Sequence, residues 1–522
     1  MITRHSPPSL SMDNQPITVL QNTTNVHSDG TTLHAFFQRH KRPADDETTG
    51  PLNKKPRAEV TTESQEAESQ DFVDDAVEEV CVPRTNTFKM LRNMYRARNV
   101  FAQPSIPTNK VLESFVSSGK ADTFYCHSLR DNTSFSPPYT CAFSNGSKRG
   151  ENSLLAVAAE DGAVHILNTA KRKDWDCEPQ RTILAAHSNA IFDLKWHPSD
   201  EYIATASGDQ TIVISSVHHE RRLTTLFGHT QSVKCLAWEP ENGNVLCSGG
   251  RDGAILVWDL RVGEKWRPST HSRELGPSLV MPQAHKNIGT RCTPNGRKVA
   301  RSITSLTYAV GKPYSIISSC AFDGVLREWD IRLPSQKSKL PKKQTRPIHM
   351  SPMDPTVECD SSSSRRPRGI TSISVGTGPT EGLLFALAND SNIHTFSADT
   401  LTPISSSRFS HETMRTNSFY IKSAISPCGK WMITGSSDRK AFLYDVSNAS
   451  RNFEISPWEG KGGVVELEGS RSEVGAVDWG HDIFAACYDR VVRVWRPDIE
   501  TRRLCEDDPE EQKWNWNWAK RL

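Results

Sequence analysis

The stretch CSGGRDGAILVWDLR, residues 247–261, decides the fold of this chain. Small and apolar residues lead into a turn at Asp252, and the alternating run after the turn ends on Trp258, six residues later. Short runs of this kind, separated by Gly, Asp and Ser, predict strands of an all-β domain. Because the same turn and spacing return elsewhere in the chain, the sequence has the signature of a repeat architecture.

The turn aspartate recurs along most of the chain, each time after a small, apolar run and before an alternating one. Its positions are Asp161, Asp209, Asp252, Asp323, Asp390, Asp438 and Asp489. The residues six positions later, which end the alternating run, are Leu167, Ser215, Trp258, Trp329, Phe396, Tyr444 and Trp495. Two intervals exceed the usual repeat of roughly 40 to 45 residues, so we expect loop insertions at 262–299 and 333–368.

This pattern resembles the WD-repeat signature, in which a Gly-His pair opens a repeat and a Trp-Asp pair closes it. Gly228 and His229 are such an opening pair. The resemblance implies an all-β, seven-bladed WD-repeat β-propeller over residues 122–498. We expect a strand near residues 123–127 to complete the last blade and close the ring, because blades are stabilised only by their neighbours.

Composition excludes several classes of protein. The 63 Lys and Arg residues nearly balance the 61 Asp and Glu residues, so no overall field points to nucleic acid. The longest apolar stretch, Leu154–Ala159, is far below the roughly 18 residues that a membrane span needs. The 12 cysteines contain no CxxC pair, which favours reduced thiols in a cytosolic or nuclear protein.

The sequence shows no motif that would assemble a nucleophile, a base and an oxyanion donor, so we expect a non-catalytic protein without cofactor or metal. Three histidines invite a catalytic or metal-binding interpretation: His187, His229 and His285. In WD repeats the histidine before the first strand forms a structural hydrogen-bond network with the turn aspartate. The resemblance therefore favours a structural role for all three.

Two repeats in succession end in the same four-residue motif. They read Trp258-Asp259-Leu260-Arg261 and Trp329-Asp330-Ile331-Arg332. Each Arg follows its strand directly, so both are expected on one face of the ring, where a guanidinium can bind carboxylates or carbonyls with two parallel bonds. The alternative is that Trp-Asp is repeat consensus and each Arg a solvated loop charge.

This doublet is similar to the signature of WD-repeat substrate receptors of the cullin-4 RING ubiquitin ligase, whose two arginines bind the ligase adaptor, damage-specific DNA-binding protein one. Residues 137–496 resemble the denticleless type of these receptors in particular. The least generic matches include AHSNAIFDLKWHP, which contains Phe192, and NSFYIKSAISPCGKWMITGSSDRKAFLYDV, which begins at Asn417. The resemblance implies that Trp258, Asp259, Arg261, Trp329, Asp330 and Arg332 bind the adaptor.

The segment 84–121 contains a basic amphipathic helix candidate, TFKMLRNMYRARNV, at residues 87–100. Its apolar side includes Phe88, Leu91 and Tyr95. It resembles the N-terminal helical element that such receptors insert into an apolar groove of the adaptor. A helix that caps the propeller's own face is the alternative.

Residues 1–83 are polar, and their second half is strongly acidic, which predicts a disordered tail. Within it, Leu33, Phe36 and Phe37 match the apolar part of a sliding-clamp-binding box, and Lys41 falls at the basic position of the degron version. Gly30 stands where the box usually has Gln. Chance apolar clustering, or a docking peptide for a different partner, is the alternative.

Basic pairs in the same tail resemble a bipartite nuclear import signal. The residues are Lys41, Arg42, Lys54, Lys55 and Arg57. The segment 499–522 is expected to be a C-terminal tail. Its alternating Trp514, Trp516 and Trp518 would lie on one side of an extended segment, either against the propeller or against a partner.

The resemblance implies a nuclear, chromatin-associated substrate receptor that recruits degron-bearing proteins bound to the DNA-loaded sliding clamp for ubiquitination. The degron and the clamp would form a composite ligand, because neither weak contact suffices alone. Basic residues of the insertions suggest DNA contact, although solvated loop charge is the simpler interpretation. Two rival functions stay open: a nuclear scaffold for chromatin assembly or ribosome biogenesis, and a propeller hydrolase or lyase.

Overall fold

The computed structural model describes residues 108–521 except 130, 132–133, 174–175, 179, 263, 268–271, 286–300, 333–345, 359–366, 450–463, 469–471 and 489. The described strands form six antiparallel or largely antiparallel sheets. We call each meander of successive antiparallel strands a blade. No helix within the described ranges is long and apolar enough to cross a membrane.

Four of the sheets have four strands each. They are β3 (Pro138–Phe143), β4 (Leu154–Ala159), β5 (Ala163–Asn168) and β6 (Thr182–Ala185); β11 (Val233–Trp238), β12 (Val245–Gly250), β13 (Ile255–Asp259) and β16 (Leu279–Met281); β17 (Ile303–Tyr308), β18 (Ser315–Cys320), β19 (Arg327–Asp330) and β20 (His349–Met350); and β21 (Ile370–Val375), β22 (Leu383–Ala388), β23 (Asn392–Ser397) and β24 (Pro403–Ser410).

The two remaining sheets are larger. One has six strands: β7 (Ile191–Trp196), β8 (Tyr202–Ser207), β9 (Thr211–Ser216), β10 (Arg221–Phe227), β15 (Ser272–Leu275) and β14 (Glu264–Arg267). The other has ten: β25 (Ser423–Ile425), β26 (Trp431–Thr434), β27 (Ala441–Asp445), β28 (Val464–Leu467), β32 (Trp516–Arg521), β1 (Phe115–Ser118), β31 (Val491–Pro497), β30 (Phe484–Cys487), β29 (Val477–Trp479) and β2 (Thr123–Tyr125).

Short helices lie before, between and after the strands. They are α3 (Thr108–Glu113), α4 (Asn145–Arg149), α5 (Pro355–Glu358), the 3-10 helix η1 (Gly378–Thr380), α6 (Ile499–Asp507) and α7 (Pro509–Gln512).

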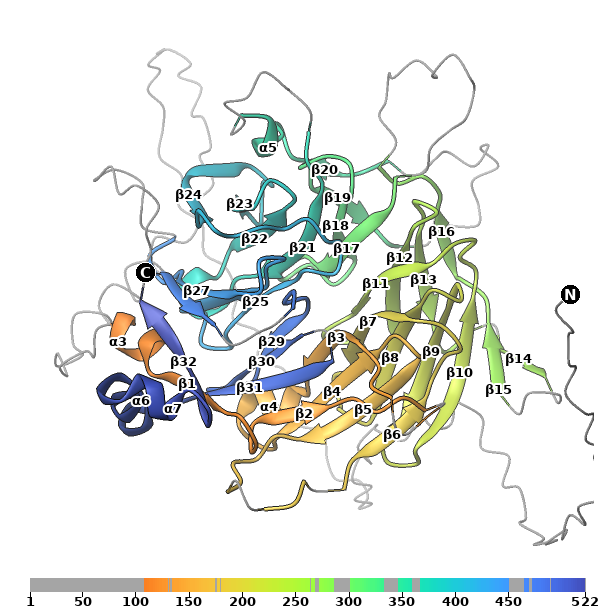
Figure 1. Ribbon diagram of the computed structural model, residues 1–522. Helices are drawn as coiled ribbons and strands as arrows, with labels where there is room; N and C mark the ends of the chain where they lie inside the picture. The colour runs from red at the N-terminus through yellow and green to blue at the C-terminus, as the bar shows by residue number, and fades with distance from the viewer. Residues whose placement is uncertain are drawn as a thin grey trace, which may run out of the picture. The chain divides into compact units, whose positions relative to one another are not determined.

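The inner strands are short apolar runs because neighbouring blades cover both of their faces. Every residue of β8 is buried, and so is every residue of β22. Contacts between the first strands of the blades close into a ring: β3 contacts β7, followed by β11, β17, β21, β25 and β29, which contacts β3 again (Figure 1). These strands line a cavity of about 850 Å³. The described chain is therefore an all-β propeller.

Tryptophans at the ends of first strands join neighbouring blades. The indole N–H of Trp196 donates to the carbonyl oxygen of Ala142, 2.8 Å away on β3. Trp238 donates in the same way to Lys195 on β7, at 3.3 Å, and Trp479 to Ala424 on β25, at 3.1 Å. The aromatic residue at this repeat position thus satisfies a carbonyl that faces the next blade.

The expectation that a strand near residues 123–127 closes the ring is confirmed. β2 pairs antiparallel with β31, with Phe124 opposite Val492. β1 also pairs with β31, so the propeller begins before the expected boundary at residue 122. Figure 1 shows β1 and β2, in orange, beside β31 and β32, in blue.

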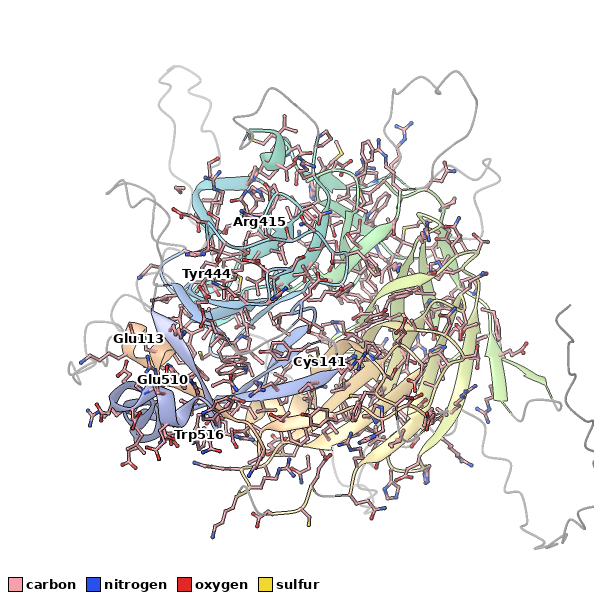
Figure 2. All side chains as sticks on the ribbon, in the orientation of Figure 1. Glu113, Cys141, Arg415, Tyr444, Glu510 and Trp516 are labelled. Carbon is pink, nitrogen blue, oxygen red and sulfur yellow. The ribbon has the colours of Figure 1, made fainter. Side chains whose placement is uncertain are left out.

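Residues 499–521 fold onto the propeller instead of forming a separate tail. β32 pairs with both β1 and β28, and Arg502 of α6 donates to the carbonyl oxygen of Glu113 at 3.0 Å. Figure 2 shows Trp516 and Glu510 on this side of the molecule, near Glu113. Trp516 and Trp518 are half-buried in β32, whereas Trp514 precedes the strand and is 80% exposed. The expectation that the three tryptophans share one side is therefore wrong for Trp514.

The insertions contain strands where loops were expected. In the first insertion, β15 pairs in parallel with β10, and β14 pairs with β15. β16 then supplies the outer strand of the following sheet. In the second insertion, β20 pairs with β19. The inserted outer strands β16 and β20 have only three and two residues, and only their inner sides pair within the blade, so their sequences carry little of the pattern by which inner strands are recognised.

Candidate functional site

The first motif begins on β13, the third strand of the blade made of β11, β12, β13 and β16. Trp258 is fully buried, and its indole N–H donates to Ser248 Oγ at 2.9 Å. Nε2 of His229 lies 2.8 Å from the same hydroxyl, and its Nδ1 lies 3.0 Å from the turn aspartate, Asp252. His187 contacts Asp209 in the same way at 2.9 Å. The predicted structural role is thus confirmed for both of these histidines.

The second motif begins on β19, the third strand of the neighbouring blade, β17 to β20, and its network differs. Trp329 again donates to a serine, Ser318 Oγ, at 2.8 Å, and Nε2 of His285 lies 2.8 Å from that oxygen. The turn aspartate, Asp323, is 4.0 Å from His285 Nδ1. Asp323 instead forms an ion pair with Arg301, whose Nη1 lies 2.9 Å from its Oδ2. The arginine therefore takes the place that the histidine holds in the other networks.

His285, Cys320 and Asp323 place possible metal ligand atoms within 4.8 Å of one another. Their chemistry does not fit a metal ion. Burial raises the pKa of Cys320 to about 12, so the thiol keeps its proton, and it lies 3.3 Å from Asp323. Burial, together with the nearby Arg327 and Arg301, lowers the pKa of His285. Two cations beside three candidate ligands oppose a third cation, so we assign this trio to the hydrogen-bond network.

The two arginines of the motifs adopt one local structure. Nε and Nη2 of Arg261 donate to the two carboxylate oxygens of Asp259 at 2.9 and 2.7 Å. Arg332 holds Asp330 with Nε, at 2.9 and 2.8 Å, and with Nη2. In both motifs the backbone N–H of the arginine also donates to the aspartate, at 3.0 and 2.9 Å. We call Arg261 and Arg332 the arginine pair.

The pair lies on one face of the propeller. Asp259, at the end of β13, is opposite Val245, where β12 begins, and Asp330 is likewise opposite Ser315, where β18 begins. The blades are neighbours, since β17 contacts β11 and β12. Both arginines therefore emerge from loops that follow third strands. We call this side the arginine face.

The local ion pairs fix the direction of each guanidinium without using all its donors. Hydrogen bonds from Arg332 hold the pKa of Asp330 below its usual value. Burial raises the pKa of Asp259, but the hydrogen bonds from Arg261 outweigh it and the pKa is lowered. Side-chain exposures of 48% and 69% leave the Nη1 ends of Arg261 and Arg332 open to a partner. A fork of this kind suits carboxylate or carbonyl acceptors.

Exposed apolar side chains accompany the pair, and sequence reasoning missed them. Val262 follows Arg261 directly and is 60% exposed. Val310 and Tyr314, in the loop after β17, are 44% and 57% exposed, and the carbonyl oxygen of Tyr314 accepts the N–H of Ile331 at 2.9 Å. Exposed apolar groups beside fixed charges are typical of protein interfaces. The only sequence signal was an apolar residue in an otherwise polar turn.

Three groups of predicted site residues lie outside the described residues. They are the helix residues Phe88, Leu91 and Tyr95, the clamp-box residues Leu33, Phe36, Phe37 and Lys41, and the import-signal residues Lys41, Arg42, Lys54, Lys55 and Arg57. Their roles therefore stay predictions.

The repeats match a known family model described as "WD domain, G-beta repeat". The matched residues are 177–214, 220–259 and 404–445. The second match ends at Asp259, on the first of the two motifs. An all-β WD-repeat propeller is therefore shown by the family model and the strand topology together.

Curated relatives narrow the family further. Denticleless protein homolog B of Xenopus laevis is 31% identical over 400 residues, which are 73% of this chain and 51% of the relative. The denticleless protein homolog of Homo sapiens is 30% identical over 69% of this chain and 46% of its own length, and the cell division cycle protein cdt2 of Schizosaccharomyces pombe 28% over 69% of each. The chain spans about half the length of the animal relatives it matches. It is a WD-repeat protein of the denticleless type.

Proposed function

We propose that this protein is a substrate receptor of a cullin-4 ubiquitin ligase. Its arginine face would bind the ligase adaptor, damage-specific DNA-binding protein one. The observation that carries the proposal is the arginine pair, held in the same geometry on neighbouring blades and accompanied by exposed apolar side chains. The match to denticleless proteins supports it.

The arginine pair suits a protein partner for physical reasons. Each guanidinium is oriented by its own aspartate, so little conformational freedom is lost when the open Nη1 end binds a backbone carbonyl or a carboxylate. Val262, Val310 and Tyr314 supply the apolar contact that excludes water around such bonds. Phe88, Leu91 and Tyr95 would add an amphipathic helix in an apolar groove of the same adaptor.

Recruitment of substrates is the second half of the proposal. Proteins that carry a degron and sit on the DNA-loaded sliding clamp would be the substrates, and ubiquitination would lead to their degradation during replication and DNA repair. Leu33, Phe36, Phe37 and Lys41 would contact the clamp itself, which raises the local concentration of the receptor there. Contact with DNA would then be indirect, through the clamp.

The proposal extends to the chemistry, the localisation and the number of blades of this protein. The receptor would act without bond chemistry or a cofactor, in the nucleus and on chromatin, with import directed by the basic pairs that end at Arg57. We also propose a seven-bladed ring, in which the ten-stranded sheet contains two blades joined through β32 and β1. The closed series of contacts from β3 to β29 supports this number.

The test is co-purification of the adaptor with the wild-type chain and with an Arg261→Ala, Arg332→Ala double variant. Wild type should capture the adaptor, and the double variant should lose at least about a hundredfold in affinity, because two charge-assisted contacts, each of about 1.5–3 kcal/mol, disappear. Both arginines are exposed, so thermal melting should stay unchanged.

Arg149 provides the matched control. Its Nε and Nη2 hold Glu151 at 2.8 and 2.7 Å in the same kind of fork, but in the first blade. Arg149→Ala should capture the adaptor like wild type. Absence of capture by the wild-type chain, or equal capture by a folded double variant, would remove the ligase proposal and favour a nuclear scaffold.

A further inference from the structure

A second surface lies on the opposite face of the propeller, at the starts of first strands. Tyr139 is the second residue of β3, Phe192 the second of β7, and Phe419 and Tyr420 precede β25. Because strands alternate in direction, this end of each blade is about 20 Å from the arginine face. We call these four residues the aromatic cluster.

The four rings form a closed circuit of contacts. Tyr139 stacks on Phe192 and on Tyr420, with ring centroids 6.1 and 5.6 Å apart. Phe419 packs edge-on against Phe192 at 5.6 Å and against Tyr420 at 5.4 Å. Phe419 is nevertheless 50% exposed, so one ring of a rigid cluster is offered to a ligand. Rigid, partly exposed aromatic groups are frequent anchors in binding sites.

Positive charge surrounds the cluster. Nζ of Lys234 lies 3.2 Å from the centre of the Phe192 ring and 4.1 Å from that of Phe419. Burial, with Arg251 and Lys422 nearby, lowers the pKa of Lys234 to about 8. Within the described ranges, none of these three cations has an ion-pair partner.

The acidic group at the edge of the cluster does not neutralise this charge. Glu473 accepts hydrogen bonds from the hydroxyl groups of Tyr420, at 2.6 Å, and Ser437, at 2.9 Å. Its position instead limits which ligands fit. A nucleic-acid strand would bring its phosphates against this carboxylate, and the single open ring of Phe419 cannot stack a run of bases. The surface therefore favours a short anionic segment of protein.

We propose that the aromatic cluster, with Lys234 and Lys422, binds an extended peptide in which a carboxylate side chain stands close to an aromatic or large apolar one. The carboxylate would bond the two lysines, and the apolar side chain would pack on Phe419. This inference rests on the proposed receptor function, for which it supplies the chemistry of the substrate site. It also explains why Phe192 and the run from Ser418 to Ser423, which are not repeat consensus, come together in space.

The test uses the full-length chain and a synthetic array of ten-residue peptides. Each peptide holds one Phe and one Glu at spacings from adjacent to four apart, and matched arrays carry Lys, Gln or phosphoserine in place of Glu. The best Glu peptide should bind at least about tenfold more tightly than its Lys counterpart, as expected for one charge-assisted contact. Lys234→Gln should remove about that preference, whereas Phe419→Ala should weaken the Glu and Lys peptides alike, by about tenfold.

A charge-reversal variant distinguishes a loss of the binding site from a loss of folding. Lys234→Glu should reject the Glu peptide and gain the Lys peptide, a result that an unfolded chain cannot give. Equal binding of Glu and Lys peptides by wild type would overturn the inference. So would a clear preference for phosphoserine, or displacement of the Glu peptide by a single-stranded oligothymidine at lower concentration.

The arginine pair separates this inference from the proposed function. The Arg261→Ala, Arg332→Ala variant should keep full peptide binding, and Lys234→Gln should keep full adaptor capture. Adaptor capture without peptide selectivity would overturn the peptide site alone. Peptide selectivity without adaptor capture would overturn the ligase proposal alone.

Discussion

The arginine face and the aromatic cluster carry positive charge in opposite ways. Each guanidinium of the arginine pair is bound by an aspartate two residues earlier in the chain, so its charge is balanced and its direction fixed. Lys234 is held by aromatic rings from two other segments, and burial, with its cationic neighbours, disfavours its charged form. The first arrangement is ready to extend a hydrogen-bond network, whereas the second gains most from a ligand that brings negative charge.

Destabilising the propeller that carries both surfaces should impair the arginine face and the aromatic cluster together, and it is the largest effect that we expect. β13 runs between the two faces and carries the buried Trp258 one residue before its end at Asp259. Trp258→Ala should cost about 3–5 kcal/mol of unfolding free energy and weaken binding on both faces together. Urea unfolding followed by fluorescence measures this cost.

Trp514 is the matched control, because it is 80% exposed. Trp514→Ala should change the unfolding free energy by no more than about 0.5 kcal/mol. A Trp258→Ala chain as stable as wild type would contradict the role of the buried network that joins Trp258, Ser248 and His229.

Removing the aspartates that orient the arginine pair should affect the arginine face only. With Asp259→Ala and Asp330→Ala, both arginines keep their charge but lose their fixed direction, so adaptor affinity should fall about tenfold while peptide binding stays unchanged. Calorimetric titration with purified adaptor measures the change. Glu151→Ala, which releases Arg149, should leave adaptor affinity unaltered, and an equal loss in that variant would show that orientation of the pair is irrelevant.

Titration of Lys234 should give the smallest effect, on the other face. Its pKa of about 8 means that it loses its proton between pH 7 and 9, so binding of a Glu peptide should weaken roughly fivefold over that range. Burial raises the pKa of the Cys235 thiol well above this range. Burial and the hydrogen bond to Glu473 raise the pKa of Tyr420 to about 12, so neither group titrates there. Fluorescence anisotropy measures the affinities.

Lys234→Arg distinguishes this titration from a general effect of pH. Arginine stays charged throughout the range, so the variant should bind the Glu peptide equally at pH 7 and 9. Adaptor binding by the wild-type arginine pair should be flat for the same reason. A wild-type peptide affinity as flat as that of Lys234→Arg would refute the assignment to Lys234.

Features that depend on contacts within one repeat could be predicted from the sequence. The repeats, the closing strand at Thr123–Tyr125 and the contacts of His187 and His229 could be predicted, because each follows from spacing within one repeat or from closure of the ring. The arginine pair is local too, since each Arg lies two residues from its Asp.

What could not be predicted depends on distant segments. Tyr139, Phe192 and Phe419 meet only because the ring brings their blades together, and no spacing in the chain announces it. β15 escaped prediction because it pairs in parallel with β10 across an insertion. Arg301 replaces a histidine contact at Asp323 through a side chain from outside the repeat pattern.

The ring is closed by partners that are synthesised far apart in time. β2 cannot pair until β31 has been synthesised. At roughly 5 to 20 residues per second, a ribosome needs about 20 to 70 seconds to pass from Tyr125 to Val491. During that interval β2 has no strand to pair with, and its open edge can accept strands of other chains. Every newly synthesised chain therefore exposes the unpaired edge of β2 until the final blade has emerged from the ribosome.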